Sequence, residues 1–422
     1  MAVPNLKLME AVEDLGYRVT VGDVSTRTGF NVEETQQALL ALAADARGHL
    51  QVAESGDIAY LFPKNFRTIL QGKFWRLRWQ KTLQQIGRIL FYLVRISFGI
   101  LLILSLVMIL VAIAVIVISL QSSQEGDSDR GESRDRSVGI FWFPLNLGDW
   151  WWMFYPDYSS RKRPQRSSSK MNFLEAIFSF LFGDGNPNSD LEELRWRAIA
   201  ATIGSQQGVV VAEQIAPYLD DLGKGYDREY ENYLLPVLVR FNGRPEVTPE
   251  GGILYQFPDL QITATEQAST SYSSYLQEKK WRFSAASSSQ IILAIGLGAA
   301  NLIGALVLGS LLTDGTVAAE LGGFVAFVES IYSILLAYGA GFLAIPLMRY
   351  FWLGQANQKI EQRNQTRRDR YSMLCDPTPE VQQKLDYAEH LGKKQAIVPD
   401  DLAYTTETDI LEQDINRLTG DP

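Results

Sequence analysis

An uninterrupted apolar run, SFGILLILSLVMILVAIAVIVISL (97–120), constrains the fold of this chain more than any other feature. The run contains no charged residue, and a helix of this length crosses about 30 Å of hydrocarbon. It begins too far from the N-terminus to be a cleaved signal peptide. The sequence therefore predicts a transmembrane helix over residues 97–120.

Two more apolar runs follow at 289–312 and 324–353, and together they predict a hairpin of transmembrane helices. Small residues let helix backbones approach closely in lipid, so they predict the packing faces of this hairpin and of a homo-oligomer. These residues are Gly296, Ala300 and Gly304 on the first run and Gly339 and Gly341 on the second. Glu329 lies about one turn inside the last run. It is interpreted either as a functional intramembrane group or as a side chain that reaches the headgroups.

Lysine and arginine set the predicted orientation of the helices. A basic helix is expected at 67–96, and no Asp or Glu occurs from 58 to 124, so the N-terminus is predicted to be cytoplasmic. Basic residues also flank the hairpin on both sides, which predicts a cytoplasmic C-terminus. The polar connector 121–170 then has to return the chain. There are three alternatives for this return. They are a re-entrant segment at 137–158, two short membrane-crossing segments within 86–120, and an exception to the charge rule.

A second constraint is a stretch that occurs twice. HLQVAESGDIAYLFP (49–63) and RPEVTPEGGILYQFP (244–258) align without a gap, and six of the 15 positions are identical. Each stretch follows a helix, a short strand and two further helices in the apolar pattern of the sequence. This order predicts one winged-helix-like unit at 1–66 and a second at 189–265.

Alternating residues of the last strand are expected to face the core of each unit. They are Ile58, Tyr60 and Phe62 in the first unit and Ile253, Tyr255 and Phe257 in the second. A winged helix that binds DNA presents a basic third helix, whereas these third helices carry Glu33 and Glu34, and Glu229 and Glu231. The net charge of −9 points the same way. Protein contacts are expected, and nucleic-acid binding is not.

The remaining segments complete a mainly α fold with small β-hairpins, in which the two units sit on a bundle of about three to four transmembrane helices. Residues 171–188 are rich in phenylalanine and predict an interfacial helix, with burial against the second unit as the alternative. Residues 354–422 predict a charged helical tail, which is either solvated or a docking arm for a basic partner.

No motif for catalysis or phosphate binding is found in the sequence. The chain contains one cysteine, Cys375, and two histidines, His49 and His390. A single thiol cannot supply the ligands of an iron–sulfur cluster or of a cysteine-rich zinc site. We therefore expect a protein without catalytic residues, metal or cofactor.

The order of these segments, with FSFLFGDGNPN (178–188) and LAYTTETDILEQ (402–413), resembles a family of conserved membrane proteins of cyanobacteria and plastids. The resemblance implies a cyanobacterial inner or thylakoid membrane, and the plastid envelope for plant members. Plant members carry an iron–sulfur cluster biosynthesis label. The single Cys375 does not suit that label in any cluster-carrying sense.

Two functions are consistent with these features. The first is a non-enzymatic membrane scaffold or assembly factor that contacts proteins through the winged-helix-like units or the acidic tail. The alternative is a transporter or channel-like component that acts as an oligomer, although its spans carry almost no charge. Membrane-tethered transcription regulation would need a basic third helix.

Overall fold

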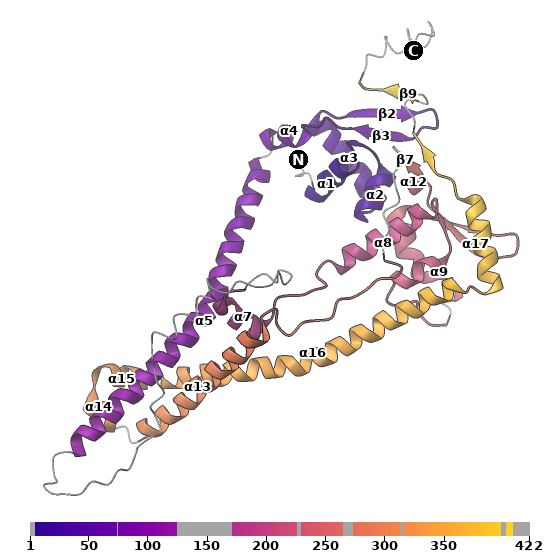
Figure 1. Cartoon of the computed structure of the whole chain (residues 1–422). Coiled ribbons are helices and arrows are strands. Elements are labelled where there is room, and N and C mark those ends of the chain that lie inside the picture. The colour runs from indigo at the N-terminus through magenta and orange to yellow at the C-terminus, as the bar shows by residue number, and fades with distance from the viewer. Residues whose placement is uncertain are drawn as a thin grey trace, which may run out of the picture. The chain divides into compact units, whose positions relative to one another are not determined.

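The computed structural model describes residues 5–73, 75–124, 171–225, 229–264, 273–313, 316–397 and 402–407. The chain is mainly helical with small sheets, as predicted (Figure 1). It forms two compact units. Unit 1 comprises Met1–Gln84, Pro187–Lys280 and Asn357–Pro422, and unit 2 comprises Gln85–Asn186 and Trp281–Ala356. The re-entrant segment expected at 137–158 lies outside the described residues.

The N-terminal segment of unit 1 (residues 5–73) alternates helices and short strands. Its elements are α1 (Leu6–Asp14), β1 (Arg18–Thr20), α2 (Val21–Thr28), α3 (Val32–Ala46), β2 (His49–Ala53), β3 (Ile58–Leu61) and α4 (Phe66–Lys73). Polar residues define the helix starts, because the side chains of Asn5, Thr20 and Asn31 accept hydrogen bonds from the first N–H groups. Gly29 ends α2 with φ +71°.

The central segment of unit 1 (residues 187–264) has a similar order of elements. They are α8 (Leu191–Ser205), β4 (Val209–Val210), α9 (Ala212–Ile215), η1 (Ala216–Tyr218), η2 (Asn232–Leu234), α11 (Leu235–Phe241), β5 (Arg244–Val247), β6 (Ile253–Gln256), α12 (Pro258–Gln261) and β7 (Ile262–Thr263). The third helix is shorter here than in the N-terminal segment, because α11 spans 7 residues and α3 spans 15.

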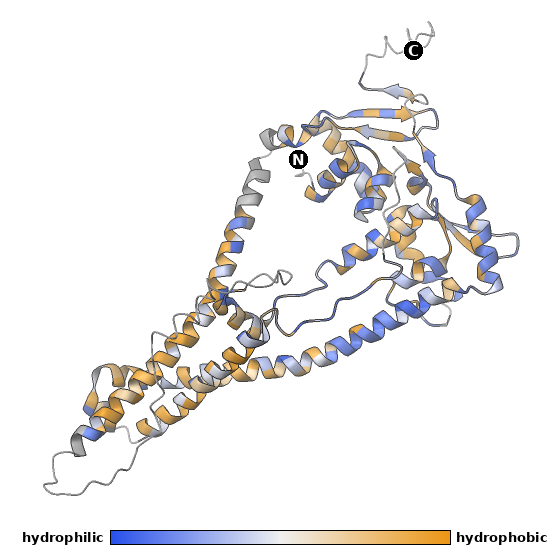
Figure 2. Ribbon diagram, in the orientation of Figure 1, coloured by the Kyte–Doolittle hydropathy of each residue, from blue (hydrophilic) through white to orange (hydrophobic). Residues whose placement is uncertain are grey.

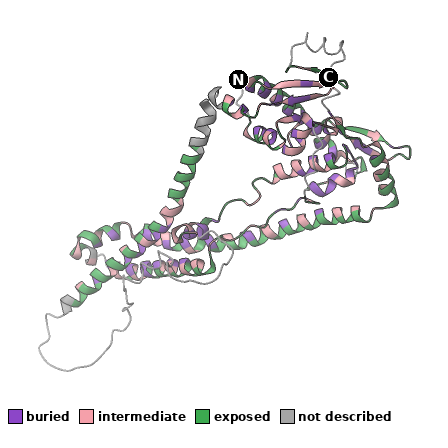
Figure 3. Cartoon of the chain, turned by 45° about the horizontal axis from the view of Figure 1, so that its top comes forward, coloured by how far each residue is buried: buried purple, intermediate pink, exposed green. Residues whose placement is uncertain are grey.

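The hairpins of the two segments pair in equivalent register. Val52 is opposite Ile58 in the first hairpin, and Val247 is opposite Ile253 in the second. In each segment the short first strand pairs with the last strand of the hairpin, so the strand order is β1-β3-β2 in one sheet and β4-β6-β5 in the other. Buried residues gather inside both segments (Figure 3).

The C-terminal part of unit 1 contains strands as well as helices. The second half of α16 (Tyr332–Cys375) is followed by α17 (Pro379–Leu391), β8 (Gln395–Ala396) and β9 (Leu402–Thr405). Strand β8 pairs parallel to β7, and β9 pairs antiparallel to β2. The prediction of a helical tail was therefore incomplete. The edges of β7 and β2 carry main-chain groups that need hydrogen-bond partners, and the tail supplies them.

Unit 2 contains the apolar helices. They are α5 (Trp75–Gln124) from Gln85 onward, α7 (Phe173–Phe182), α13 (Ser288–Leu312), α14 (Thr316–Leu321), α15 (Gly323–Ser330) and the first half of α16. Among the residues that the structure describes, three helical stretches are long and apolar enough to cross a membrane, namely Gln85–Gln121, Ser288–Leu312 and Tyr332–Cys375. Figure 2 shows α16 changing from hydrophobic in its first half to hydrophilic in its second. The predicted run 324–353 is not one helix, because α15 ends before Ile331.

Candidate functional site

The six predicted core residues of the hairpins occupy equivalent places in the two segments. Tyr60 and Phe62 are buried in the core of the N-terminal segment, and Tyr255 and Phe257 are buried in that of the central segment. Ile58 and Ile253 are partly buried against the same cores. The hydroxyl of Tyr255 donates to Glu231 Oε2 at 2.8 Å, and burial followed by this carboxylate raises the pKa of Tyr255.

Of the five small residues predicted to form packing faces, two lie at helix contacts and three do not. Gly304 faces Ile109 of α5, and Gly339 faces Asn301 of α13, but Gly296 and Gly341 have no neighbour within 4 Å of an added Cβ. Ala300 is exposed. These spans instead meet at Gly298, where an added Cβ would lie 2.5 Å from Phe342. The buried stripe of α13 thus runs through Gly298 and Asn301, which the spacing of small residues alone did not identify.

Asn301 is a buried polar residue among these apolar helices, with no exposed surface. Its Nδ2 donates to Ser105 Oγ of α5, and Ser105 donates in turn to the carbonyl of Leu102 at 3.0 Å. Hydrogen bonds of this kind hold helices together in lipid. Glu329, which was predicted to lie about one turn inside the last apolar run, is exposed on α15.

The phenylalanine-rich helix α7 packs on the spans of unit 2. The sequence predicted an interfacial helix, or burial against the second winged-helix-like unit at 189–265. Ile177, Phe180 and Leu181 are buried beside Leu102 and Phe342. The GDG turn after α7 fixes this position. Asp184 accepts hydrogen bonds from Arg95 Nη2 at 2.9 Å, Ser179 Oγ at 2.7 Å and the N–H of Ala285 at 2.7 Å.

Arg349 of α16 completes the contacts at the end of α7. Its Nη1 donates to the carbonyl of Phe180 at 2.9 Å, and its guanidinium lies over the ring of Phe283. Gly183 has φ +82°, and a Cβ at this position would lie 2.8 Å from Arg349 Nη2. The FGDG sequence that carries the family resemblance is therefore the turn that ties α7 to α5, to the start of α13 and to α16.

A highly connected charged cluster lies in unit 1, on one face of α16. Arg363, Arg367 and Arg370 are spaced by four and three residues, so they share a helix face. Arg367 has 2% of its side chain exposed and donates through Nη2 to Glu278 Oε1 at 2.8 Å and to Asp220 Oδ1. Burying a guanidinium requires this degree of pairing.

Glu278 is the second buried member of the cluster, with 6% of its side chain exposed. Arg363 donates to it twice, at 2.7 Å from Nε and 2.5 Å from Nη2, in a bidentate pair. The Arg363 hydrogen bond lowers the pKa of Glu278 against the opposing effect of burial, and Arg367 lowers it further. Burial would raise the pKa of Asp220, but the hydrogen bond from Arg367 and the charge of Arg195 outweigh it and lower that pKa.

Main-chain contacts extend the same face of α16. The side-chain amide of Asn364 bonds to both main-chain groups of Glu278, each at 2.9 Å. Arg370 Nη1 donates to the carbonyls of Leu219 at 2.7 Å and Ala216 at 3.2 Å, at the end of η1. Through these contacts α16 binds two separate stretches of the chain, around residues 216–220 and 276–278.

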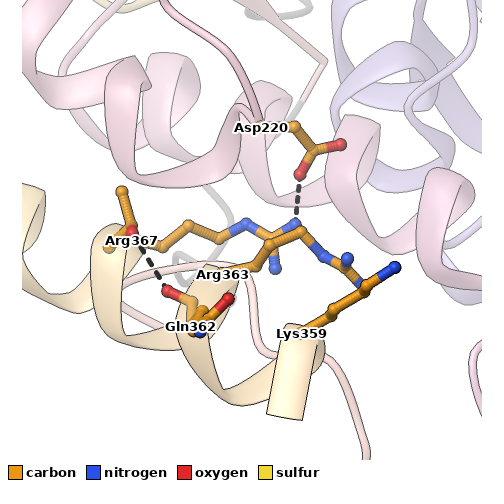
Figure 4. Close-up of a pocket in the computed structure, with 6 residues that line it drawn as sticks. Asp220, Lys359, Gln362, Arg363 and Arg367 are labelled. Atoms are coloured by element: carbon orange, nitrogen blue, oxygen red, sulfur yellow. Dashed lines mark hydrogen bonds and ion pairs between the residues drawn. The ribbon is translucent and has the colours of Figure 1, made fainter. Parts of the chain in front are cut away.

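A pocket of about 240 Å³ opens beside this cluster. It is lined by Asp220, Lys359, Gln362, Arg363, Thr366 and Arg367, and Figure 4 shows the carboxylate of Asp220 directed at the guanidinium of Arg367. Within the described ranges, no group of three or more His, Cys, Asp or Glu side chains could hold a metal ion. The arrangement binds parts of the chain to each other, and it contains no nucleophile paired with a base.

Helix α17 makes a second polar contact with the central segment. Lys384 Nζ bonds to Glu213 Oε1 at 3.1 Å and to Glu231 Oε1 at 3.4 Å. Burial alone would lower the pKa of Lys384, but the two carboxylates raise it. Ala388 of the same helix belongs to a buried apolar cluster with Val209 and Leu254.

A third polar junction joins the N-terminal segment, the central segment and the tail. Arg18 Nη1 donates to the carbonyls of Ala264 at 2.5 Å and Ile397 at 2.9 Å. Asp23 accepts from the hydroxyl of Thr263 at 2.7 Å and from the N–H of Ala264 at 2.8 Å. Sequence reasoning identified none of these junction residues, because each partner lies more than 200 residues away along the chain.

Comparison with known proteins places this chain in a family. The chain is 41% identical over 421 residues to the uncharacterized protein At5g03900, chloroplastic, of Arabidopsis thaliana, and the match covers 96% of this chain and 79% of the plant protein. No family model matches the chain. No solved structure matches it either. A plastid-related family is thus confirmed, whereas the match carries no iron–sulfur label. The chain belongs to the family of this chloroplastic plant protein.

Proposed function

We propose that this chain is a non-enzymatic scaffold or assembly factor, anchored in a photosynthetic membrane, that holds a protein partner through unit 1. The observation that carries the proposal is the composition of unit 1. It gathers three stretches, Met1–Gln84, Pro187–Lys280 and Asn357–Pro422, that are separated in the sequence by the membrane-capable helices. A chain that only conducted a solute would have no need for such a composite unit.

This composition also supports a topology with both termini in the cytoplasm or its plastid counterpart. Helix α2 packs on α8, which supports placing the stretches before and after the first span on one side of the membrane. The chain would then return to that side between residues 121 and 187. The later pair of spans, Ser288–Leu312 and Tyr332–Cys375, would bring the C-terminal stretch back to the same side.

We expect the topology to appear in the labelling of single cysteines by a membrane-impermeant thiol reagent on sealed, oriented vesicles. The natural Cys375, and Ser55→Cys or Glu250→Cys in a Cys375→Ser background, should all react from one face, because all three exposed sites belong to unit 1. Glu320→Cys, on α14 after the second span, should react from the other face. Labelling of Ser55→Cys and Glu250→Cys from opposite faces would contradict this topology.

The surface of the central segment supports protein contacts over nucleic-acid binding. We propose that the N-terminal and central segments are copies of one winged-helix-like unit, since their strand orders and hairpin registers agree. The third helix of the second copy, α11, exposes Leu235 by 55% and Val239 by 76%. Its Arg240 is occupied, because Nε donates to the carbonyl of Gly29 at 2.8 Å and the guanidinium lies over Trp196. Such a face suits an apolar protein surface better than phosphate.

The partner should be lost when this face is made basic. In a Leu235→Lys, Val239→Lys variant purified in mild detergent, we expect the amount of co-purifying partner to fall at least about tenfold, because charge excludes an apolar contact. Both side chains are exposed, so the fold should be retained. Gln37→Lys, an exposed change on α3, is the matched control and should keep the partner. Equal recovery from all three proteins would argue against this face, and absence of any stoichiometric partner would argue against a scaffold.

A further inference from the structure

The pocket beside the charged cluster of unit 1 has one wall that is a single face of α16. The residues of this wall recur at intervals of three and four positions, and they are Lys359, Gln362, Arg363 and Thr366. Figure 4 shows the side chains of Lys359 and Arg363 extending in the same direction, below the carboxylate of Asp220. At about 240 Å³ the pocket is smaller than sites for drug-sized molecules, so it suits a small polar group.

The ion pairs around this pocket leave one positive charge without a carboxylate. The charged residues that line it and their ion-pair partners carry four positive and three negative charges. They are Lys359, Arg363, Arg367 and Arg195, with Asp220, Glu278 and Glu192. Each arginine of this set has a carboxylate partner, whereas Lys359 makes no ion pair within the described part of the chain. The neighbouring Glu361 is paired with Lys280 instead. The surplus charge therefore lies at Lys359.

The donors that face the pocket are free, and the carboxylate beside them is not. Both oxygens of Asp220 already accept hydrogen bonds, Oδ1 from Arg367 and Oδ2 from Arg195. Glu278 takes Nε and Nη2 of Arg363, which leaves Nη1 as a donor on a side chain that is 46% exposed. Lys359 is exposed as well. The pocket thus presents an ammonium group and a guanidinium N–H to an anion.

The phosphate diester of a phospholipid matches this arrangement. It carries a single negative charge, and its oxygens accept from ammonium and guanidinium groups. The sequence of α16 favours a lipid as the source of this phosphate. Lys359 follows Leu353, the end of the apolar run, by six residues or about 9 Å of helix. The headgroup layer extends about 5–8 Å beyond the hydrocarbon. A lysine side chain covers the difference, because helical side chains tilt towards the N-terminus.

We propose that this pocket binds a phosphate group, and that the headgroup of an anionic lipid provides it. Lys359 would donate from Nζ, and Arg363 would donate from Nη1 while it keeps its bidentate pair with Glu278. The side-chain amide of Gln362 would add a neutral donor. Thr366 would not take part, because its hydroxyl donates to the carbonyl of Gln362 at 3.0 Å. The inference goes beyond the proposed function and does not rest on it, since a scaffold and a transporter can each hold a lipid.

The test uses the full-length protein in a neutral detergent, with phosphatidylglycerol and inorganic phosphate as separate probes. Native mass spectrometry would count the phosphatidylglycerol molecules that the protein retains, with phosphatidylcholine at the same concentration as the reference. Equilibrium dialysis would measure the binding of inorganic phosphate. In the wild type we expect at least about a fivefold preference for phosphatidylglycerol over phosphatidylcholine, and the preference should weaken as the ionic strength rises.

Two substitutions remove the surplus charge in different ways. Lys359→Gln deletes the free ammonium group, and Gln362→Glu adds a carboxylate to the wall of the pocket. Both positions are exposed, so the fold should be retained. Each variant should lose the preference, with retention of phosphatidylglycerol falling at least about fivefold. Arg368→Gln is the matched control, because it removes an equal charge from α16 outside the pocket and should retain the lipid as the wild type does.

The two probes distinguish the two sources of phosphate. A lipid preference that both pocket variants lose supports a headgroup site. Saturable binding of inorganic phosphate that the same variants lose also supports a phosphate site, with free phosphate as an occupant. The proposal is overturned if the wild type shows neither result, if Lys359→Gln and Gln362→Glu behave like the wild type, or if Arg368→Gln loses as much binding as they do. None of these outcomes affects the co-purification test on α11.

Discussion

Replacing Arg367 with methionine is expected to lower the free energy of unfolding of unit 1 by about 3 kcal/mol, because removal of one buried partner leaves the charges of the cluster less well compensated. Glu278 is 6% exposed and would keep Arg363 but lose its second guanidinium. Asp220 would lose its hydrogen bond from Arg367 Nη2. The measurement is denaturant unfolding of the detergent-solubilised protein, followed by tryptophan fluorescence and by far-UV circular dichroism.

The neighbouring residue provides a matched control for this change. Arg368 is exposed on the same turn of α16, so Arg368→Gln removes an equal charge without opening the cluster, and a change within about 0.5 kcal/mol is expected. Equal losses for the two variants would show that the cluster around Arg367 does not stabilise unit 1.

Lowering the pH should reduce the stability that the same cluster contributes. The pKa of Glu278 is lowered in the folded state, so its contribution to stability is present above the unfolded pKa and is lost as the pH falls through the folded pKa. Unfolding free energies measured from pH 6 downward should therefore decrease in the wild type. Arg367→Met should show a smaller decrease, because one of the two guanidinium groups that hold this pKa down is gone.

Local sequence patterns predicted the helices and hairpins whose signals lie within a short stretch of the sequence. The apolar run 289–312 corresponds to α13, Ser288–Leu312, with Ser287 as its capping residue. The two similar stretches that end in Phe-Pro correspond to the hairpins β2–β3 and β5–β6. In these cases the apolar period, the cap or the glycine turn lies within about 15 residues of the sequence, so the signal is complete in a short window.

Contacts between distant elements could not be predicted in the same way. Small residues of α13 can face a neighbour at several angles, and the choice of Gly298 over Gly296 depends on where Phe342 of α16 lies. The charges of α16 were interpreted as markers of membrane orientation, although Arg367 binds Asp220, 147 residues earlier in the sequence. The strand β9 was missed because its pairing depends on the open edge of β2, which no pattern within the tail reveals.

A second large loss of stability is expected from a change at the contact between the N-terminal and central segments. Gly29 ends α2 with φ +71°, and a Cβ at this position would lie 2.6 Å from the main-chain nitrogen of Arg197 and 2.7 Å from the main-chain carbon of Trp196. Helix α8 cannot give way at its backbone without moving as a whole. Gly29→Ala should therefore lower the free energy of unfolding by about 4 kcal/mol, the sum of a left-handed backbone cost and an overpacking cost.

Gly56→Ala separates these two costs. Gly56 has φ +89° in the turn of the β2–β3 hairpin, and an added Cβ there meets nothing within 4 Å. This variant should lose only the backbone cost, about 1–2 kcal/mol. The difference between the two variants, measured by denaturant unfolding, reports the packing of α2 on α8. Displacing Gly29 would also disturb its carbonyl, which accepts from Arg240, so the apolar face of α11 should become more sensitive to proteolysis in Gly29→Ala alone. Equal losses in the two variants would mean that the N-terminal and central segments do not form one unit, and the labelling of Ser55→Cys and Glu250→Cys would then lose its structural basis.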